Sequence, residues 1–153
     1  MKRSMGETIL GWGRLYIGEH QASMNDKSSS MSIKSLENFK VYQCSAELLA
    51  FVSKILDSLP RGNGAIADQL RRSSLSIPLN IAEGAGKTSP IDKRRFYAIA
   101  RGSTLETFAL LDACLRLKLI EKQTFLEGRE KLHEIAAMLT RLTTSTNVRG
   151  PTR

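Results

Sequence analysis

The carboxylates of Glu83 and Glu106 and the imidazole of His133 are the first candidates for proton transfer or metal binding. A di-iron helix bundle needs a lone Glu from each of two helices and a Glu-x-x-His motif from each of the other two. Glu130-Lys131-Leu132-His133 matches that motif once, and the only other histidine, His20, lies in an irregular N-terminal segment. The sequence therefore predicts no metal site, and we expect His133 on a helix surface.

The sequence lacks the residues that nucleophilic catalysis and nucleotide binding require. Neither a Ser/His/Asp nor a Cys/His arrangement is complete. The segment Gly84–Thr88 resembles the end of a phosphate-binding loop, but it lacks the first glycine and follows a helix where a strand is needed. Cys44 and Cys114 belong to no Cys-x-x-Cys pattern and are expected in the core, which is typical of a reducing cytoplasm. We expect no catalytic site and no cofactor.

The balance of charge favours an anionic partner. Lys and Arg number 23 against 15 Asp and Glu, which gives a net charge of +8 and a pI of about 9.8. An excess of this size favours nucleic acid first and a membrane surface second. The candidate residues for nucleic-acid binding are Lys87, Lys93, Arg94, Arg95 and Arg101.

Two interpretations of Lys93, Arg94 and Arg95 stay open. These cations lie near the N-terminal end of their predicted helix, where the helix dipole mildly disfavours them. They either contact phosphates, from several copies of the chain in one oligomer, or form a solvated face on which Lys93 or Arg95 pairs with Asp92. We expect Phe96 to be buried, so no aromatic platform is available, and binding would be directed at the backbone and sensitive to salt.

A second group of polar residues is expected to hold two helices together. Its members are Arg71, Arg72, Asn80, Glu83 and Glu106. We expect the Glu106 carboxylate to accept hydrogen bonds from Arg71, Arg72 or Asn80 across the helix pair. If that site is buried, removing one partner strands a charge and costs about 3–5 kcal/mol.

Hydrophobic periodicity predicts four helices and no strand. Their expected limits are Ser35 (N-cap) to the stop at Leu59–Gly62, Asn63 (N-cap) through Pro78 to Gly84 and Gly86, Ser89 (N-cap) to Leu117, and Glu121 to Thr144. Gly102-Ser103, inside the third helix, predicts a close approach of another helix. Short loops between long amphipathic helices predict an all-α, antiparallel up-down-up-down four-helix bundle. We expect a flexible N-terminal extension over residues 1–34, the bundle over 35–145 and a frayed tail over 146–153.

One stretch carries a family resemblance. The run Ser76-Ile77-Pro78-Leu79-Asn80-Ile81-Ala82-Glu83-Gly84, preceded by Arg71-Arg72 and followed by Gly102-Ser103-Thr104-Leu105-Glu106, resembles a bacterial four-helix-bundle family. Its members are encoded in intervening sequences of 23S ribosomal RNA genes, and some are labelled ribosomal proteins. The resemblance covers roughly residues 36–144 and implies a fold and a homo-oligomer, in particular a pentamer, more than a chemistry.

Two functions are compatible with that resemblance. The first is a non-enzymatic oligomer that binds RNA or DNA. The second is a protein-interaction scaffold, since a related fold occurs as the basic pentameric accessory protein of diversity-generating retroelements, which works with a reverse transcriptase and nucleic acid. No apolar run approaches the ~18 residues of a membrane-spanning helix, and we expect no membrane partner. The isolated cysteines make a reducing cytoplasm the expected location.

Overall fold

The computed structural model describes residues 31–144, and within that range the protein is all-α, with five helices and no strand. The helices are α1 (Ile33–Glu37), α2 (Lys40–Ser58), α3 (Gly64–Gly86), α4 (Pro90–Arg116) and α5 (Lys122–Thr144). The extension expected to be flexible, as far as residue 30, and the tail expected to be frayed lie outside the described residues.

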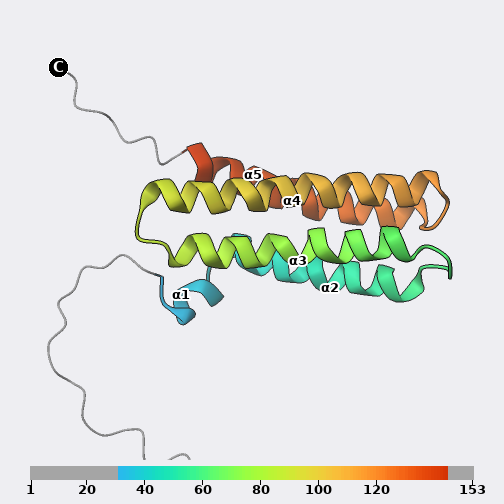
Figure 1. The fold of residues 1–153 in the computed structure, drawn as a ribbon, viewed down its shortest axis with the longest axis horizontal. Coiled ribbons are helices and arrows are strands. Elements are labelled where there is room, and N and C mark those ends of the chain that lie inside the picture. Colours follow the sequence, from blue (N-terminus) through green and yellow to red (C-terminus); the bar gives the residue numbers. More distant parts are fainter. Residues whose placement is uncertain (1–30, 145–153) are drawn as a thin grey trace, which may run out of the picture.

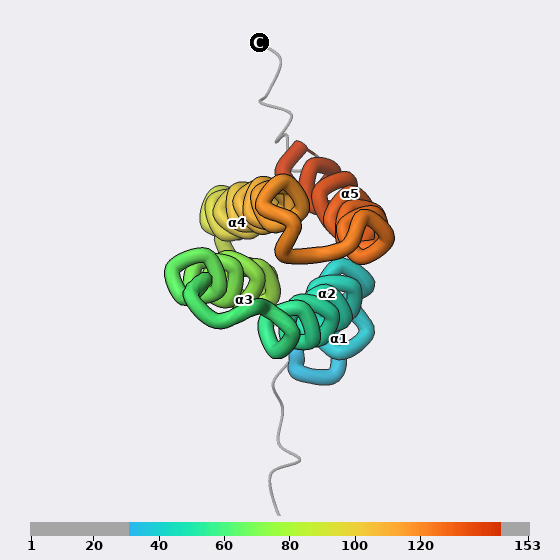
Figure 2. Tube along the Cα trace, turned by 90° about the vertical axis from the view of Figure 1, so that its right-hand side faces the viewer, coloured from blue at the N-terminus to red at the C-terminus, as the bar shows by residue number. Residues whose placement is uncertain are grey.

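The long helices α2 to α5 lie side by side along one axis (Figure 1). Seen along that axis, α4 and α5 form one layer and α2 and α3 form the other (Figure 2). Each helix packs on two neighbours, because contacts join α2 to α3, α3 to α4, α4 to α5 and α5 back to α2. The core between the layers takes fully buried residues from all four, including Leu48, Leu70, Leu111 and Ile135.

The first long helix begins later than its sequence pattern predicted, after a separate short helix. Ser32, not Ser35, caps that short helix: the Ser32 hydroxyl accepts a hydrogen bond from the Ser35 amide at 3.2 Å. Asn38 then interrupts the helix, and its side-chain amide donates to the Lys34 carbonyl at 3.0 Å. The predicted cap at Ser35 was therefore wrong. The hydrogen bond of the Asn38 side chain satisfies the end of a short helix, whereas hydrophobic periodicity alone predicts one continuous helix through this point.

α3 continues through Pro78, as the sequence predicted, and ends at Gly86. Pro78 has no amide proton, so the helix loses one backbone hydrogen bond there. Hydroxyl groups in the preceding turns bond to nearby carbonyls: Ser73 donates to Leu70 at 3.3 Å and Ser74 to Arg71 at 3.1 Å. Pro78 is itself buried, so packing around it offsets the local cost.

The start of α4 confirms the sequence prediction. The Ser89 hydroxyl caps the helix by accepting a hydrogen bond from the Asp92 amide at 3.4 Å, and Pro90 is the first helical residue. Proline suits this position because its missing amide proton would have no partner in the first turn. At the other end Lys118 adopts a positive φ of 57°, which reverses the chain towards α5.

Small residues mark the places where helices approach closely. A Cβ on Gly84 would lie 2.8 Å from Cε1 of Tyr97, so α3 and α4 meet there with no room for a side chain. Ser103 is buried against α3, as expected, but a Cβ on the neighbouring Gly102 would meet nothing within 4 Å. The predicted close approach therefore holds for Ser103 and not for Gly102.

Candidate nucleic-acid interface

The five residues of the expected polar network do not come together in the structure. Glu106 is exposed and accepts a hydrogen bond from Nε2 of Gln69 at 2.5 Å. Asn80 instead donates to the Ser76 carbonyl, within α3, at 2.8 Å. Arg71 pairs with Asp68 at 2.9 Å on the surface of the same helix. The prediction that Glu106 bonds to Arg71, Arg72 or Asn80 was therefore wrong.

Hydroxyl groups hold the α3–α4 contact in place of that network. The Ser76 and Ser103 hydroxyls lie 2.8 Å apart, and the Thr107 hydroxyl lies 3.0 Å from that of Ser73. Charged side chains are too large for so close a contact, whereas a hydroxyl fits and satisfies its neighbour. The helical spacing of serine and threonine on these two facing stripes is the signal that points to this contact.

Lys87, one of the proposed phosphate-binding residues, joins the ends of two helices. Its ammonium pairs with the Glu83 carboxylate, the remaining member of the expected network, one turn back in the chain. The same ammonium lies 4.9 Å from the centroid of the Phe96 ring on α4, a cation–π contact. Lys87 is thus largely occupied with intramolecular partners, and Phe96 is only half-buried rather than fully buried as expected.

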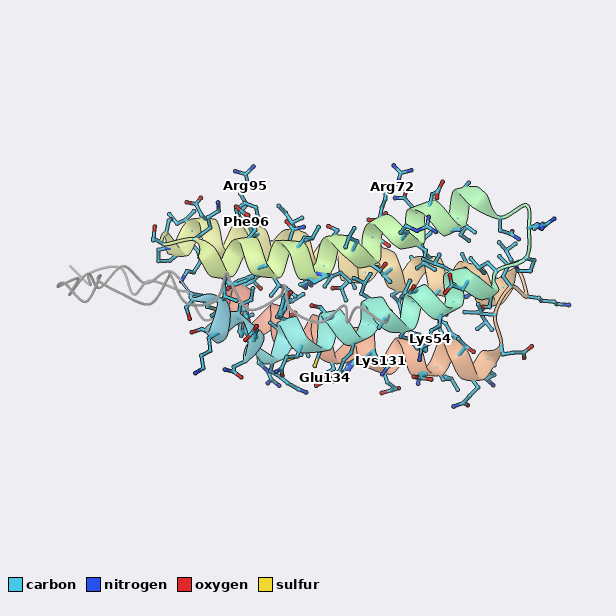
Figure 3. The ribbon with its side chains drawn as sticks, turned by 90° about the horizontal axis from the view of Figure 1, so that it is seen from below. Lys54, Arg72, Arg95, Phe96, Lys131 and Glu134 are labelled. Atoms are coloured by element: carbon cyan, nitrogen blue, oxygen red, sulfur yellow. The ribbon has the colours of Figure 1, made fainter. Side chains whose placement is uncertain are left out.

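The other basic candidates lie along α4. Lys93 and Arg94 are half-buried, and Arg95 and Arg101 are exposed. Within residues 31–144 no ion pair involves Arg94, Arg95 or Arg101. Arg95 and Arg72 project from the same side of the molecule, formed by α3 and α4, while Lys54, Lys131 and Glu134 lie on the opposite side (Figure 3).

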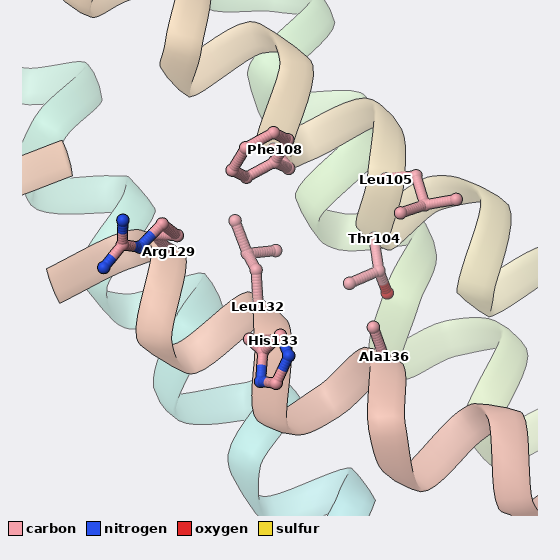
Figure 4. Close-up of a pocket in the computed structure, with 7 residues that line it drawn as sticks. All are labelled: Thr104, Leu105, Phe108, Arg129, Leu132, His133 and Ala136. Carbon is pink, nitrogen blue, oxygen red and sulfur yellow. The ribbon is translucent and has the colours of Figure 1, made fainter. Parts of the chain in front are cut away.

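An apolar groove runs between α4 and α5, which periodicity did not reveal. It has a volume of about 300 Å³ and is lined by residues that include Leu105, Phe108, Leu132 and Ala136, with Arg129 and His133 at its edge (Figure 4). Leu105 is 53% exposed. His133 lies on the surface, as predicted, and residues 31–144 contain no group of three His, Cys, Asp or Glu side chains that could hold a metal ion.

A second groove, between α2 and α3, has a volume of about 430 Å³. Small side chains, Ala46, Ala50 and Ala82, line it together with Leu75 and Leu79. Leu79 is 59% exposed. Apolar residues outside the core-facing stripe are the sequence signal for both grooves.

Both cysteines are free and buried, as the sequence predicted. Burial raises the pKa of each thiol, and for Cys44 the nearby Glu134 carboxylate raises the pKa further. The Cys44 thiol donates a weak hydrogen bond to Oε1 of Glu134 at 3.6 Å. A thiol with a raised pKa stays protonated and is a poor nucleophile, so these cysteines act as core residues.

Over the described residues, no helix has the length and apolar character needed to cross a membrane.

Comparisons with known proteins agree with this fold. None of the curated proteins matches the chain. A similar solved structure, a protein of unknown function from the S23 ribosomal protein family of Bacteroides thetaiotaomicron VPI-5482, shares 23% sequence identity, with a TM-score of 0.64, over 68% of this chain and 98% of that one. The family model described as 23S rRNA-intervening sequence protein matches residues 37–141, and the chain belongs to that family.

Proposed function

We propose that the protein is a non-enzymatic homo-oligomer that binds nucleic acid through its phosphate backbone in the cytoplasm. The protomer is an antiparallel up-down-up-down four-helix bundle, and the oligomer is a pentamer by its family resemblance. The protein needs no cofactor, because binding of this kind requires only cations held in a fixed arrangement.

One observation carries the proposal: several arginine side chains of α3 and α4 have no carboxylate partner within the described residues. Arg94, Arg95 and Arg101 have no ion pair within the described residues, and Arg72 projects from the same side as Arg95 (Figure 3). Arginine presents a planar fork of donors that matches phosphate geometry. The net charge of +8 adds long-range attraction for a polyanion.

The test compares two variants with the same change in charge. In the first, Lys93, Arg94 and Arg95 are replaced by Glu. In the control, Lys54, Lys118 and Lys122, which are exposed and lie outside the α4 cluster, are replaced by Glu. Both variants and the wild type are titrated with a structured RNA and a DNA duplex at two salt concentrations, after circular dichroism has shown that each variant is folded.

We expect the α4 variant to lose most of its affinity and the control to keep the greater part. Each phosphate contact contributes about 0.9 to the slope of log K against log salt for duplex DNA. Loss of three contacts therefore flattens that slope by roughly 2 to 3. Equal affinities and equal slopes for the two variants would refute a specific phosphate-binding role for this end of α4.

The grooves favour a second candidate, a protein-interaction scaffold whose charge is incidental. Leu79 and Leu105 expose apolar surface on two different faces, and exposed patches of this kind often mark interaction sites. A scaffold predicts weak and equal retention of nucleic acid by the wild type and both charge variants. The same titration therefore separates the two functions.

A further inference from the structure

Two exposed arginines, Arg72 on α3 and Arg95 on α4, project from the same side of the bundle (Figure 3). Neither forms an ion pair within residues 31–144. Asp68, one turn before Arg72, pairs instead with Arg71 at 2.9 Å. Arg72 and Arg95 are therefore two separate points of uncompensated positive charge on the α3/α4 side.

Two hydroxyl contacts fix how α3 and α4 lie against each other lengthwise. The hydroxyls of Ser76 and Ser103 lie 2.8 Å apart, and those of Ser73 and Thr107 lie 3.0 Å apart. A step back along α3 therefore corresponds to a step forward along α4. Because the helices meet at both pairs, a position on one helix can be related to a position on the other by counting residues.

Arg72 and Arg95 lie in opposite directions from the contact between Ser76 and Ser103. Arg72 comes four residues before Ser76 on α3, and Arg95 comes eight residues before Ser103 on α4. Since the order of residues is opposed on the two helices, these counts add. At a rise of about 1.5 Å per residue, the two arginines are roughly 18 Å apart along the bundle. They are too far apart to hold a single phosphate group together.

The facing stretches of the two helices carry no further cation between these arginines. On α3, residues 73–86 include neither Lys nor Arg. On α4, Arg101 lies one turn before Leu105, which lines the groove between α4 and α5, so Arg101 belongs to a different side. A single strand laid along the bundle would therefore pass phosphates between Arg72 and Arg95 that no cation meets.

A nucleic-acid duplex presents two rows of phosphates at a spacing of this size. The major groove of B-form DNA is about 12 Å wide, which places phosphorus atoms on its two sides roughly 18 Å apart once the radius of the phosphate groups is added. We propose that Arg72 and Arg95 bind phosphates of opposite strands, so that the α3/α4 side spans a groove of a duplex. This inference rests on the phosphate binding of the proposed function and adds the form of nucleic acid that is bound.

The polar groups on this side of the bundle leave the two arginines as its phosphate-binding groups. Asn80 is half-buried, and its amide donates to a carbonyl within α3. The Glu83 carboxylate pairs with Lys87, and the Glu106 carboxylate accepts a hydrogen bond from Gln69. In the spanning arrangement the open groove, and not a phosphate row, lies over this surface. A-form RNA offers two phosphate rows across its wide, shallow minor groove, so the inference concerns the duplex form and not the sugar.

The experiment removes each arginine without adding a negative charge. The variants are Arg72→Gln, Arg95→Gln and the two combined. Arg71→Gln is the matched control, because it removes the same charge from an exposed neighbour that is already paired with Asp68. After circular dichroism has shown that each protein is folded, all are titrated with a DNA duplex and with one of its strands alone, at several salt concentrations.

We expect the double variant to flatten the slope of log K against log salt by about 1.8 for the duplex, because each contact contributes about 0.9. One contact of this kind corresponds to about eightfold in affinity at 0.1 M salt relative to 1 M. For the single strand the slope should change by no more than about 0.7, the contribution of one contact on such a strand. Arg71→Gln should leave the duplex slope unchanged.

The outcomes separate this inference from the proposed function. Equal slope changes for the duplex and the single strand, or an Arg72→Gln variant that binds the duplex as Arg71→Gln does, would overturn the spanning arrangement. If the wild type still binds both probes more tightly at low salt, phosphate binding stands without it. A wild type whose binding does not depend on salt overturns the proposed function and the spanning arrangement together.

Discussion

Gly128, in the first third of α5, should not tolerate even one added methyl group. A Cβ at this position would lie 2.8 Å from Cδ1 of Leu111 and 3.0 Å from Cε1 of Phe51. Carbon atoms prefer separations of about 3.5–4.0 Å. Leu111 is fully buried, so its methyl group has no solvent to move into, and α5 must shift away from α2 and α4.

The size of the effect follows from two opposing terms. Replacing glycine by alanine inside a helix stabilises by about 1 kcal/mol, whereas inserting a methyl group into a packed core costs about 1–3 kcal/mol. Gly128→Ala should therefore lower the unfolding free energy by about 1 kcal/mol. Gly102→Ala is the matched control, because it lies in the middle of α4 with nothing within 4 Å of the new Cβ, and it should gain about 1 kcal/mol.

Urea unfolding followed by circular dichroism, at one protein concentration, measures both changes. The two variants should differ by about 2 kcal/mol, which corresponds to about 4–8 °C in Tm for a chain of this size. An unchanged m-value shows that the folded state has kept its compactness. If Gly128→Ala is as stabilising as Gly102→Ala, α5 does not pack on its neighbours as closely as described.

Two further predictions concern buried polar groups. Thr107→Val keeps the shape of the side chain but removes the hydroxyl that lies 3.0 Å from that of Ser73, so urea unfolding should show that the unfolding free energy falls by about 0.5–1.5 kcal/mol. Glu106→Ala, at an exposed site, is the control and should change the unfolding free energy by less than about 0.5 kcal/mol. Equal effects of the two substitutions would contradict the hydroxyl contact. The unfolding free energy should also fall as the pH rises above about 9. Burial holds the thiol pKa values of Cys44 and Cys114 above the ordinary 9.0. Above that pH the unfolded chain releases thiol protons that the folded chain retains, so a rising pH favours unfolding. A Cys44→Ala, Cys114→Ala variant should show a shallower decline between pH 8 and 10, and an identical decline would mean that the thiols do not titrate differently on unfolding.

Helix limits were predictable where the signal is local. Ser89 and Pro90 begin α4 as expected, and α3 ends at Gly86, because a capping hydroxyl and a missing amide proton act within one turn. The start of α2 was predicted wrongly, since the hydrogen bond from the Asn38 side chain to the Lys34 carbonyl interrupts the helix where the hydrophobic pattern is continuous. Local hydrogen bonds of this kind can end a helix where the hydrophobic periodicity continues. The periodicity alone therefore does not locate that helix end.

The candidate site was predictable only in part. The cluster of cations on α4 follows from the order of residues, and Arg95 and Arg101 are exposed as phosphate binding requires. The state of Lys87 was not predictable, because its contact with Phe96 depends on how α3 and α4 meet. Glu106 was assigned to a buried network because its sequence neighbours are small, yet it lies on the surface beside Gln69.

The amino-acid order by itself determined the helical class, the buried faces, the free thiols and the excess of positive charge, since each depends on residue type and on contacts within a few turns. Tertiary packing alone decided which hydroxyls meet between α3 and α4, which arginines lack a carboxylate, and which apolar residues remain on opposite faces. These properties depend on the distance between helices that are far apart in the chain, and that distance is set by the fit of all their side chains together.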